Sequence, residues 1–462
     1  MTISVSAVAS IFLLTWAIKR LLNTLAARKQ GLYPPGPRPK PFIGNIFDFP
    51  VAQYPQAFVE WEKKYNSPIL HAEVFGSHIL VINSLDDAIA LFERPERARI
   101  YSDRPIMTVN ELMGWDTINV ALMPYGEVWR RHRKVCHQNF NIQAARQYEL
   151  VQTKKVRELL RNLLYTPEQF DNHNKLFSVS VTISTMYGHD VESIEDPCVR
   201  LSDETLLLGS PLLVPGGSLI NVIPALRYIP EWVPGAYSRK VAAKVRRMTS
   251  EALRIAMGYV NKSFEAGTVA PSLVTDFYEK KHASGASEEE EDIIKNIAYT
   301  VYGDVQTISF TSSFVYLMTV NPDVQRKAQV EIDSVIGSKR LPEFADRTTV
   351  FTNIWAMSYN EKAYPDPYAF KPERFLDNEG KLTDDKVLAY GFGRRGCVGK
   401  PMASSTTWIM MVSILAAFDI TKSKDKHGND VEVNDKFQND GLMLYVLTVP
   451  PSFYRAYNVS RR

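Results

Sequence analysis

The chain has 462 residues, 45% of them hydrophobic, a length that suits two or three ordinary domains or one large one. Its 54 basic and 51 acidic residues leave a net charge of +3, too small an excess to make nucleic acid the main partner. Three cysteines are too few for a disulfide-stapled secreted domain, so we expect a reducing compartment. Cys136 and Cys198 are expected to be buried apolar side chains.

The N-terminus predicts a membrane anchor. Residues 3–18 carry no charge, and Lys19 and Arg20 follow them. This run is shorter than the roughly 20 residues of a straight span, but leucines beyond the basic pair extend it if those side chains snorkel. A cleaved signal peptide is the alternative, although its basic residues normally precede the apolar run. The positive-inside rule favours a body on the cytoplasmic side, so we expect an anchor over residues 1–25.

A basic and proline-rich linker follows over residues 26–45. Alternate prolines in Tyr33–Pro41 forbid a helix and hold the backbone extended, which makes the connection semi-rigid. No second low-complexity linker and no internal repeat occurs beyond it. Residues 46–462 therefore form one continuous body.

Most of this body shows the apolar periodicity of helices. Two helix N-termini are indicated by capping residues. Ser287 precedes an acidic run, and Asn321 with Pro322 precedes residues 324–336. The acidic run indicates a solvated helix start rather than a binding site. The longest predicted helices are Ala144–Leu164, Val241–Phe264, Asp292–Thr319 and Lys400–Phe418. Alternating or β-branched stretches predict strands at Ile69–Phe75, His78–Asn83 and Leu442–Val449. The fold class is therefore mainly α with minor β.

The strongest chemical signal is a glycine-dense loop, Tyr390–Gly399, which contains Cys397 and precedes an apolar helix. Its glycines let the backbone approach a flat ligand closely, and a helix N-terminus favours a thiolate. A thiol nucleophile would need a histidine base, and a zinc site would need further Cys or His nearby; neither is present locally. Axial ligation of a haem iron by the thiolate accounts best for this setting.

The loop resembles the haem-binding signature of the cytochrome P450 family, Phe-x-x-Gly-x-Arg-x-Cys-x-Gly. Gly393, Arg395, Cys397 and Gly399 occupy its fixed positions, and Tyr390 stands where the family usually has Phe. The tyrosine ring keeps the packing, but its hydroxyl needs a partner. The resemblance implies that Cys397 is the axial ligand of a haem b iron and that these neighbours surround the haem.

Other segments extend the resemblance over nearly the whole chain. Trp129 and Arg133 match a Trp-x-x-x-Arg helix that contacts a haem propionate, a carboxylate that a guanidinium binds well. Pro372–Phe375 matches the family's Pro-Glu-Arg-Phe stretch. The sequence Asn321–Gly337 resembles most closely the corresponding helix of fungal microsomal members.

The resemblance implies an activity and its partners. The fold would be the helical one of the family with small sheets, and the activity insertion of one oxygen atom from O2 into a lipophilic small molecule, in secondary metabolism or xenobiotic oxidation. Electrons would come from NADPH through NADPH-cytochrome P450 reductase, with cytochrome b5 as a second candidate donor. The anchor would sit in membrane lipid of the endoplasmic reticulum.

The oxygen-activation motif departs from the family. The central helix normally carries Gly-x-acid-Thr-Thr, whose acid and alcohol relay protons. Aligned on Gly303 and Thr307, this chain has Val305 at the acid and Gln306 at the alcohol. A slip of one residue would bring Asp304 or Thr307 into service, and Gln306 has the groups to position water. The catalytic candidates are therefore Asp304, Gln306 and Thr307.

A larger departure is the loss of the family's Glu-x-x-Arg helix, which is absent from residues 321–375. The chain passes directly from Arg347 to Thr348, as an internal deletion near 347/348 would leave it. Four earlier matches are interpreted as chance patterns on helix surfaces: Glu96/Arg99, Glu127/Arg130, Glu158/Arg161 and Glu251/Arg254. Without the helix, Arg374 is expected to be a buried charge lacking its partners, at a cost of about 3–5 kcal/mol.

The deletion leaves alternatives open. A skipped exon, a mistaken gene model or a decayed copy would give such a chain, with weak haem binding or marginal folding and no catalysis. A thiol hydrolase that uses Cys397 without haem is a third hypothesis. Apolar segments at Met107–Leu122 and Leu206–Val222, with Trp115 and Pro211, indicate a greasy substrate and nothing finer.

Overall fold

The computed structural model describes most of the chain between Tyr33 and Val431, together with Thr15 and a C-terminal strand. The described residues are 15, 33–41, 43–49, 54–74, 77–105, 107–213, 217–221, 223–303, 307–336, 361, 364–367, 369–377, 383, 390–424, 427–431 and 457–461. Apart from Thr15, the predicted anchor lies outside them, as does the predicted strand Leu442–Val449. Among the described residues, no helix combines the length and apolarity needed to cross a bilayer.

The chain divides into two compact units, which we treat separately. The first comprises residues 1–101, 353–368 and 392–394, and the second comprises the rest. In the first unit, β1 (Ile69–Val74) pairs antiparallel with β2 (Ser77–Ile82), with Ile69 opposite Ile82. These strands confirm the two predictions made for this part of the chain. Around them lie α2 (Tyr54–Tyr65), α3 (Leu85–Phe92) and α4 (Pro95–Ala98).

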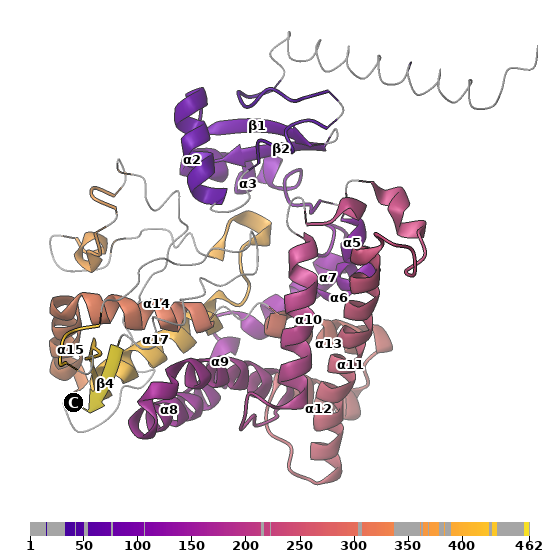
Figure 1. Cartoon of the computed structure of the whole chain (residues 1–462). Helices are drawn as coiled ribbons and strands as arrows, with labels where there is room; N and C mark the ends of the chain where they lie inside the picture. The colour runs from indigo at the N-terminus through magenta and orange to yellow at the C-terminus, as the bar shows by residue number, and fades with distance from the viewer. Residues whose placement is uncertain are drawn as a thin grey trace, which may run out of the picture. The chain divides into compact units, whose positions relative to one another are not determined.

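The second unit is almost entirely helical (Figure 1). Its helices are α5 (Thr108–Met113), α6 (Trp115–Ile118), α7 (Glu127–Phe140), α8 (Glu149–Tyr165), α9 (Phe170–Tyr187), α10 (Pro197–Leu213), α11 (Tyr237–Glu265), α12 (Leu273–Ser284), α13 (Glu288–Gly303), α14 (Thr307–Val320), α15 (Pro322–Ile336) and α17 (Lys400–Ala417). Its described strands are β3 (Phe418–Lys422) and β4 (Tyr457–Arg461), paired antiparallel. The predicted class, mainly α with minor β, is confirmed, and both described sheets are antiparallel.

Local sequence signals explain several helix starts. At α13, the Glu290 amide donates to the Ser287 hydroxyl at 3.2 Å, and the Ser287 amide donates back to the Glu290 carboxylate at 3.0 Å, a capping box. Pro322 opens α15 as predicted, since an N1 proline gives up no helical hydrogen bond. The predicted helix Asp292–Thr319 is described as α13 and α14, and residues 304–306 between them lie outside the described residues.

One predicted helix begins differently. Residues Ala144–Tyr148 form a 3₁₀ turn, and the α-helix α8 starts only at Glu149. The side chain of Asn141 accepts hydrogen bonds from the amides of Gln143 and Ala144, both at 3.0 Å, just before this turn. Apolar periodicity over such a short stretch does not separate a 3₁₀ turn from an α-helical one.

A buried polar contact fixes α17, the helix that follows the cysteine loop. The side-chain amide of Gln152 on α8 donates to the hydroxyl of Thr406 at 2.8 Å and the carbonyl of Met402 at 3.2 Å. Gln152 has 0% exposure, so these bonds replace water that it has lost. Around them the buried face of α17, which includes Trp408 and Ile409, packs into the main apolar cluster. The start of α17 therefore has a rigid support.

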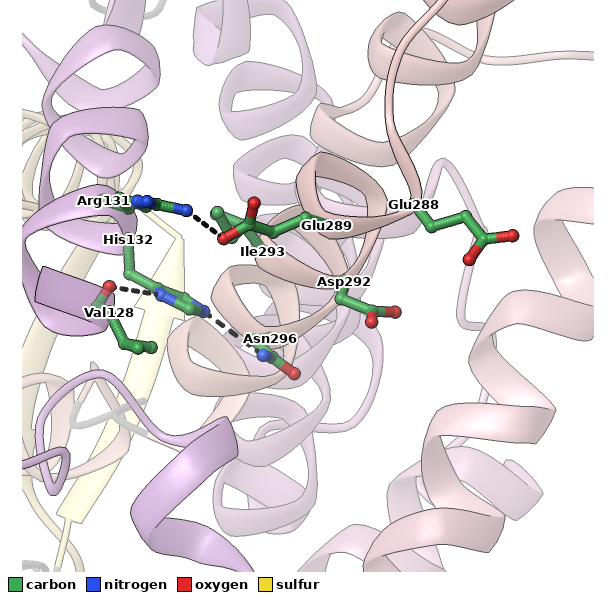
Figure 2. Close-up of a pocket in the computed structure, with 8 residues that line it drawn as sticks. All are labelled: Val128, Arg131, His132, Glu288, Glu289, Asp292, Ile293 and Asn296. Carbon is green, nitrogen blue, oxygen red and sulfur yellow. Dashed lines mark hydrogen bonds and ion pairs between the residues drawn. The ribbon is translucent and has the colours of Figure 1, made fainter.

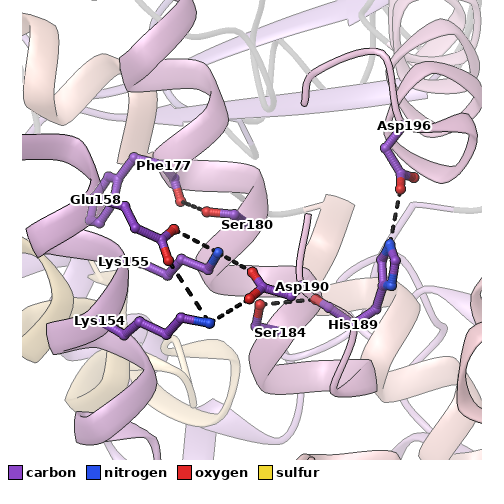
Figure 3. A network of polar contacts seen from close by, with 9 residues as sticks. All are labelled: Lys154, Lys155, Glu158, Phe177, Ser180, Ser184, His189, Asp190 and Asp196. Atoms are coloured by element: carbon purple, nitrogen blue, oxygen red, sulfur yellow. Dashed lines mark hydrogen bonds and ion pairs between the residues drawn. The ribbon is translucent and has the colours of Figure 1, made fainter. Parts of the chain in front are cut away.

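The connection between α9 and α10 is held by two polar clusters (Figure 3). Asp190 forms ion pairs with Lys154 and Lys155 of α8, and the Lys155 side chain is only 2% exposed. His189 bonds the Asp196 carboxylate at 3.0 Å and stacks on Tyr259 of α11 with ring centroids 3.7 Å apart. These contacts join the connection to α8 and to α11.

Candidate functional site

Cys397 lies directly before α17 in the second unit. Cys397 is exposed, whereas Cys136 and Cys198 are buried as predicted. The Cys397 amide donates to the carbonyl of Tyr390 at 2.7 Å, which closes the loop. Gly399 is the N-cap of α17 and has no side chain to satisfy the first amides. The positive end of an 18-residue helix thus lies beside the sulfur and favours its thiolate.

Tyr390 has the hydroxyl partner that its position in the motif requires. Its hydroxyl lies 2.8 Å from the Ser404 Oγ, and the Lys400 Nζ lies 5.5 Å from its ring centroid. Burial raises the pKa of the Tyr390 phenol, which keeps it neutral. The exchange of phenylalanine for tyrosine is therefore accommodated within the chain.

Gly393 has a backbone that only glycine adopts without strain. Its φ is +55°, and a Cβ built on it would lie 2.1 Å from the carbonyl oxygen of Phe92, also in the first unit. Any side chain would push these two backbones apart. The fixed glycine of the motif is explained by this close approach.

Arg395 makes the most extensive contacts of the loop. Its guanidinium donates to the carbonyls of Ser102 at 2.7 Å, Met123 at 2.9 Å and Val120 at 3.4 Å. It also lies 4.4 Å from the ring of Trp129, a cation–π contact. Burial, followed by repulsion from Arg104, lowers the pKa of Arg395 to about 10.

Trp129 and Arg133 come from one face of α7. Trp129 is 4% exposed, and the guanidinium of Arg133 donates to the carbonyl of Gly396, the residue before Cys397. Burial lowers the pKa of Arg133, while the nearby Cys397 raises it. Two elements far apart in the sequence thus bring the predicted haem-propionate residues to the cysteine loop.

These residues fit a haem. Arg133 and Arg395 are half-buried cations, and neither forms an ion pair with a carboxylate of any described residue. Half-buried cations so close together call for an anion. A haem supplies two propionates, and several of the ten guanidinium N–H groups are still available for them. The exposed sulfur of Cys397 beside them is a suitable iron ligand.

The candidate oxygen-activation residues remain predictions. Asp304 and Gln306 lie outside the described residues. Thr307 is the first residue of α14, and its side chain is not described. Just before them, the Tyr302 hydroxyl donates to Asp203 of α10 at 3.1 Å, which fixes the end of α13.

The prediction of a buried Arg374 without partners is wrong. Arg374 is partly exposed, and its guanidinium donates to the carbonyls of Ala369 at 2.8 Å and Lys371 at 3.2 Å. The neighbouring Glu373 pairs with Lys327 of α15 at 2.7 Å on the surface. A partly exposed guanidinium keeps some of its hydration, so the full penalty for a buried charge does not apply.

The predicted substrate segments pack tightly against each other and against α11. Trp115, 2% exposed, donates to the Thr249 hydroxyl at 2.9 Å. A Cβ on Gly209 of α10 would lie 2.4 Å from the Trp115 ring, so glycine is needed there. This apolar cluster comprises Val109, Met113, Trp115, Leu122, Leu212, Leu213, Val241, Ala242 and Val245. The apolar character is as predicted, but these residues fill space with side chains.

Sequence reasoning missed a polar cavity of about 330 Å³ between α7 and α13 (Figure 2). Two of its contacts link the helices: Arg131 pairs with Glu289, and His132 bonds Asn296 at 3.2 Å. The remaining lining residues are Val128, Glu288, Asp292 and Ile293. No short motif contains residues so far apart in the chain, and the acidic run is indeed a solvated helix start.

A helical body with an exposed cysteine before a helix start and two half-buried arginines near it has the features of a haem-thiolate protein. The family model of cytochrome P450 matches residues 34–349 and 347–444, which is most of the chain. The chain belongs to the cytochrome P450 family, and its relatives are fungal monooxygenases.

Three relatives illustrate the likeness. Cytochrome P450 monooxygenase COX2 of Coprinopsis cinerea is 34% identical, over 93% of this chain and 90% of its own. Cytochrome P450 monooxygenase ple1 of Rhodocybe pseudopiperita is 32% identical, over 90% of this chain and 89% of its own. Tryptamine 4-monooxygenase of Psilocybe cyanescens is 29% identical, over 90% of this chain and 91% of its own.

The alignments also differ from this chain in length. The two stretches matched by the family model, residues 34–349 and 347–444, meet at residues 347–349. The alignment with COX2 spans 481 positions, more than the 462 residues of this chain. Since 93% of 462 residues is about 430, roughly 50 of those positions have no counterpart here.

Proposed function

We propose that this chain is a haem-dependent monooxygenase that inserts one oxygen atom from O2 into a lipophilic small molecule of secondary metabolism or xenobiotic oxidation. The observation that carries the proposal is the meeting of Trp129 and Arg133 with Arg395 and Gly396 beside the exposed Cys397. Family membership supports the reaction type.

Each residue has a role in this proposal. Cys397 would hold the iron of haem b through its sulfur, and the N-terminus of α17 favours the thiolate form of that sulfur. Arg133 and Arg395 bind the haem carboxylates, and the Trp129 indole adds one N–H donor. Gly393, Gly399 and Tyr390 shape the loop, as described above. The bound haem supplies activation of O2, which thiolate donation promotes.

Proton delivery during that reaction is proposed for the stretch after Gly303. Asp304 and Thr307 carry exchangeable protons, and Gln306 can orient a water molecule. Valine at position 305 has no such group, so the acid of the family motif has to come from a neighbour.

The cellular setting follows from the N-terminal sequence. We propose that residues 1–25 anchor the chain in the endoplasmic reticulum membrane, that residues 26–45 are the linker, and that the haem domain faces the cytoplasm. NADPH-cytochrome P450 reductase, and cytochrome b5 as a second donor, would then reach it from the same side. Lipid around the anchor would also concentrate lipophilic substrates.

The missing segment belongs to the same proposal. Relatives carry roughly 50 residues without a counterpart in this chain, and the family matches meet at residues 347–349. The absent Glu-x-x-Arg helix normally braces the cysteine loop through Arg374. We therefore expect weaker haem binding than in a relative that has this helix.

Turnover with isotopically labelled oxygen tests the proposal. The full chain, haem, a fungal reductase and NADPH are incubated under ¹⁸O2 with lipophilic compounds, including tryptamine because one relative is named for it. One labelled oxygen atom in a product supports the proposal, provided that Cys397→Ala abolishes it. If haem-loaded protein consumes NADPH without ever labelling a compound, the proposed monooxygenase activity is wrong.

A further inference from the structure

His132 and Asn296 join the helix that carries Trp129 and Arg133 to the central helix α13 (Figure 2). His132 lies on α7 next to Arg133 in the sequence, and it is 4% exposed. Its two ring nitrogens both have partners, which together fix how the ring is protonated.

The hydrogen bonds assign one tautomer to His132. The Nδ1 atom lies 2.8 Å from the carbonyl oxygen of Val128, which only accepts, so Nδ1 carries a hydrogen. The Nε2 atom lies 3.2 Å from the side-chain nitrogen of Asn296, which only donates, so Nε2 carries none. Burial lowers the pKa of His132 and keeps this neutral form.

Asn296 also holds a second segment. The same side-chain nitrogen lies 3.4 Å from the carbonyl oxygen of Thr117, so its two hydrogens serve two partners. One turn further along α13, the Thr300 hydroxyl accepts a hydrogen bond from the Val120 amide at 3.0 Å. One face of α13 therefore binds α7 and α6 through Asn296, and the segment that follows α6 through Thr300.

Two of the elements that α13 contacts also contact or carry the arginines beside Cys397. The segment after α6 supplies the Val120 and Met123 carbonyls that accept hydrogen bonds from Arg395. Through His132, α13 holds the helix that carries Trp129 and Arg133. Asn296 is thus bonded to α7 through His132 and to α6, directly before the segment whose carbonyls accept hydrogen bonds from Arg395.

We propose that His132 and Asn296 are positioning residues of the haem site, which hold Trp129, Arg133 and Arg395 in place through one neutral imidazole and one carboxamide. This inference rests on the proposed haem site at Cys397. The charged groups that face His132 are Arg131 on its own helix and Glu288, Glu289 and Asp292 on α13. From the α6 side, Asn296 meets a backbone carbonyl, which does not titrate.

The test replaces the Asn296 donor by an acceptor of the same shape. In Asn296→Asp, a carboxylate faces the bare Nε2, so the bond forms only when His132 takes a second proton. We expect haem affinity to fall about tenfold near pH 9, where the imidazole is neutral, and to recover to within about threefold of wild type near pH 6. Titration of the apoprotein with haem, followed by absorbance, measures this.

The controls use the neighbouring ion pair on the same two helices. The side chains of Arg131 and Glu289 are 51% and 63% exposed, so we expect Arg131→Gln and Glu289→Gln to change haem affinity less than about threefold at both pH values. Recovery of Asn296→Asp at low pH within one preparation shows that the variant is folded. A second variant, Asn296→Leu, should be weak at both pH values.

The outcomes separate this inference from the proposed function. If the wild type itself forms no haem–thiolate complex, the proposed function fails. If the wild type binds haem but Asn296→Asp behaves like it, or is equally weak at both pH values, only the positioning role is overturned. An equal loss in the ion-pair variants would also overturn it, because general helix contact would then be the cause.

Discussion

Two partly exposed arginines of the second unit, Arg395 and Arg374, contrast in where their partners lie. Arg395 reaches the carbonyls of Ser102, Val120 and Met123, more than 270 residues earlier in the chain. Arg374 donates to the carbonyls of Ala369 and Lys371, three to five residues away. Both belong to motifs of the same family, yet the carbonyls just named lie far along the chain for Arg395 and close by for Arg374.

The difference follows from which partner residues the sequence contains. The partners of Arg395 are backbone groups of residues 102–123, which the chain retains in full. The family partners of Arg374 belong to the Glu-x-x-Arg helix, which the sequence lacks. The cysteine loop therefore has its contacts with residues 102–123, whereas the Pro372–Phe375 turn has bonds to nearby carbonyls and an ion pair between Glu373 and Lys327 at the surface.

Restoring the absent segment should have the largest effect on this contrast. In a chain with the corresponding residues of COX2 inserted between Arg347 and Thr348, Arg374 gains a charged, buried environment. Arg374→Leu should then cost about 3–5 kcal/mol of unfolding free energy, because it leaves a buried partner uncompensated. Urea unfolding of both restored proteins measures this, and a cost below about 1 kcal/mol would show that the deletion did not remove the partners.

Arg395→Leu in the present chain should come next. The variant removes three donors from the carbonyls of Ser102, Met123 and Val120 and a cation from the face of Trp129. Hydrogen bonds to charged groups contribute about 1.5–3 kcal/mol each but are not additive, so we expect a total near 3 kcal/mol. Haem affinity should fall as well. Chemical unfolding and haem titration check both, and unchanged values would contradict the role given to this arginine.

Gly393→Ala should destabilise the loop by about 2 kcal/mol. The φ of +55° disfavours alanine by about 1 kcal/mol, and the added Cβ would lie 2.1 Å from the Phe92 carbonyl oxygen. Gly391 is a matched control, because its φ is also positive at +72° while a Cβ there meets nothing within 4 Å. Thermal melting of the two variants separates the overlap from the backbone preference, and equal shifts would refute the close approach.

The smallest effect is expected for Arg374→Leu in the present chain. Its guanidinium is partly exposed and bonds to nearby carbonyls, so its removal should cost about 1 kcal/mol or less. The Soret band should not change. A loss of several kcal/mol in urea unfolding would mean that Arg374 has kept the bracing role it has in the family.

Local chemistry made much of the fold predictable. The Pro322 start of α15, the capping of α13 by Ser287 and the apolar periodicity of α11 and α17 all depend on residues within one or two turns. The Cys397 loop was predictable because its glycines, Arg395 and the start of the following helix lie close together in the sequence.

Long-range contacts were not predictable in the same way. The bond between His132 and Asn296 joins residues 164 apart, and neither residue type marks a site by itself. The exposure of Arg374 was predicted wrongly, because the expectation placed the family's buried environment around it although the sequence lacks a Glu-x-x-Arg pattern in residues 321–375. The segments around Trp115 were correctly judged apolar, but periodicity does not tell a packed cluster from the wall of a pocket.

The absorbance of reduced protein under carbon monoxide tests the central claim most directly, because it reports on the bond between the Cys397 sulfur and a haem iron. Full-length chain expressed with ample haem should give the red-shifted Soret band of a thiolate-ligated haem, and Cys397→Ser should lose it. A folded protein that stays colourless, or a serine variant with an unchanged spectrum, would contradict the account.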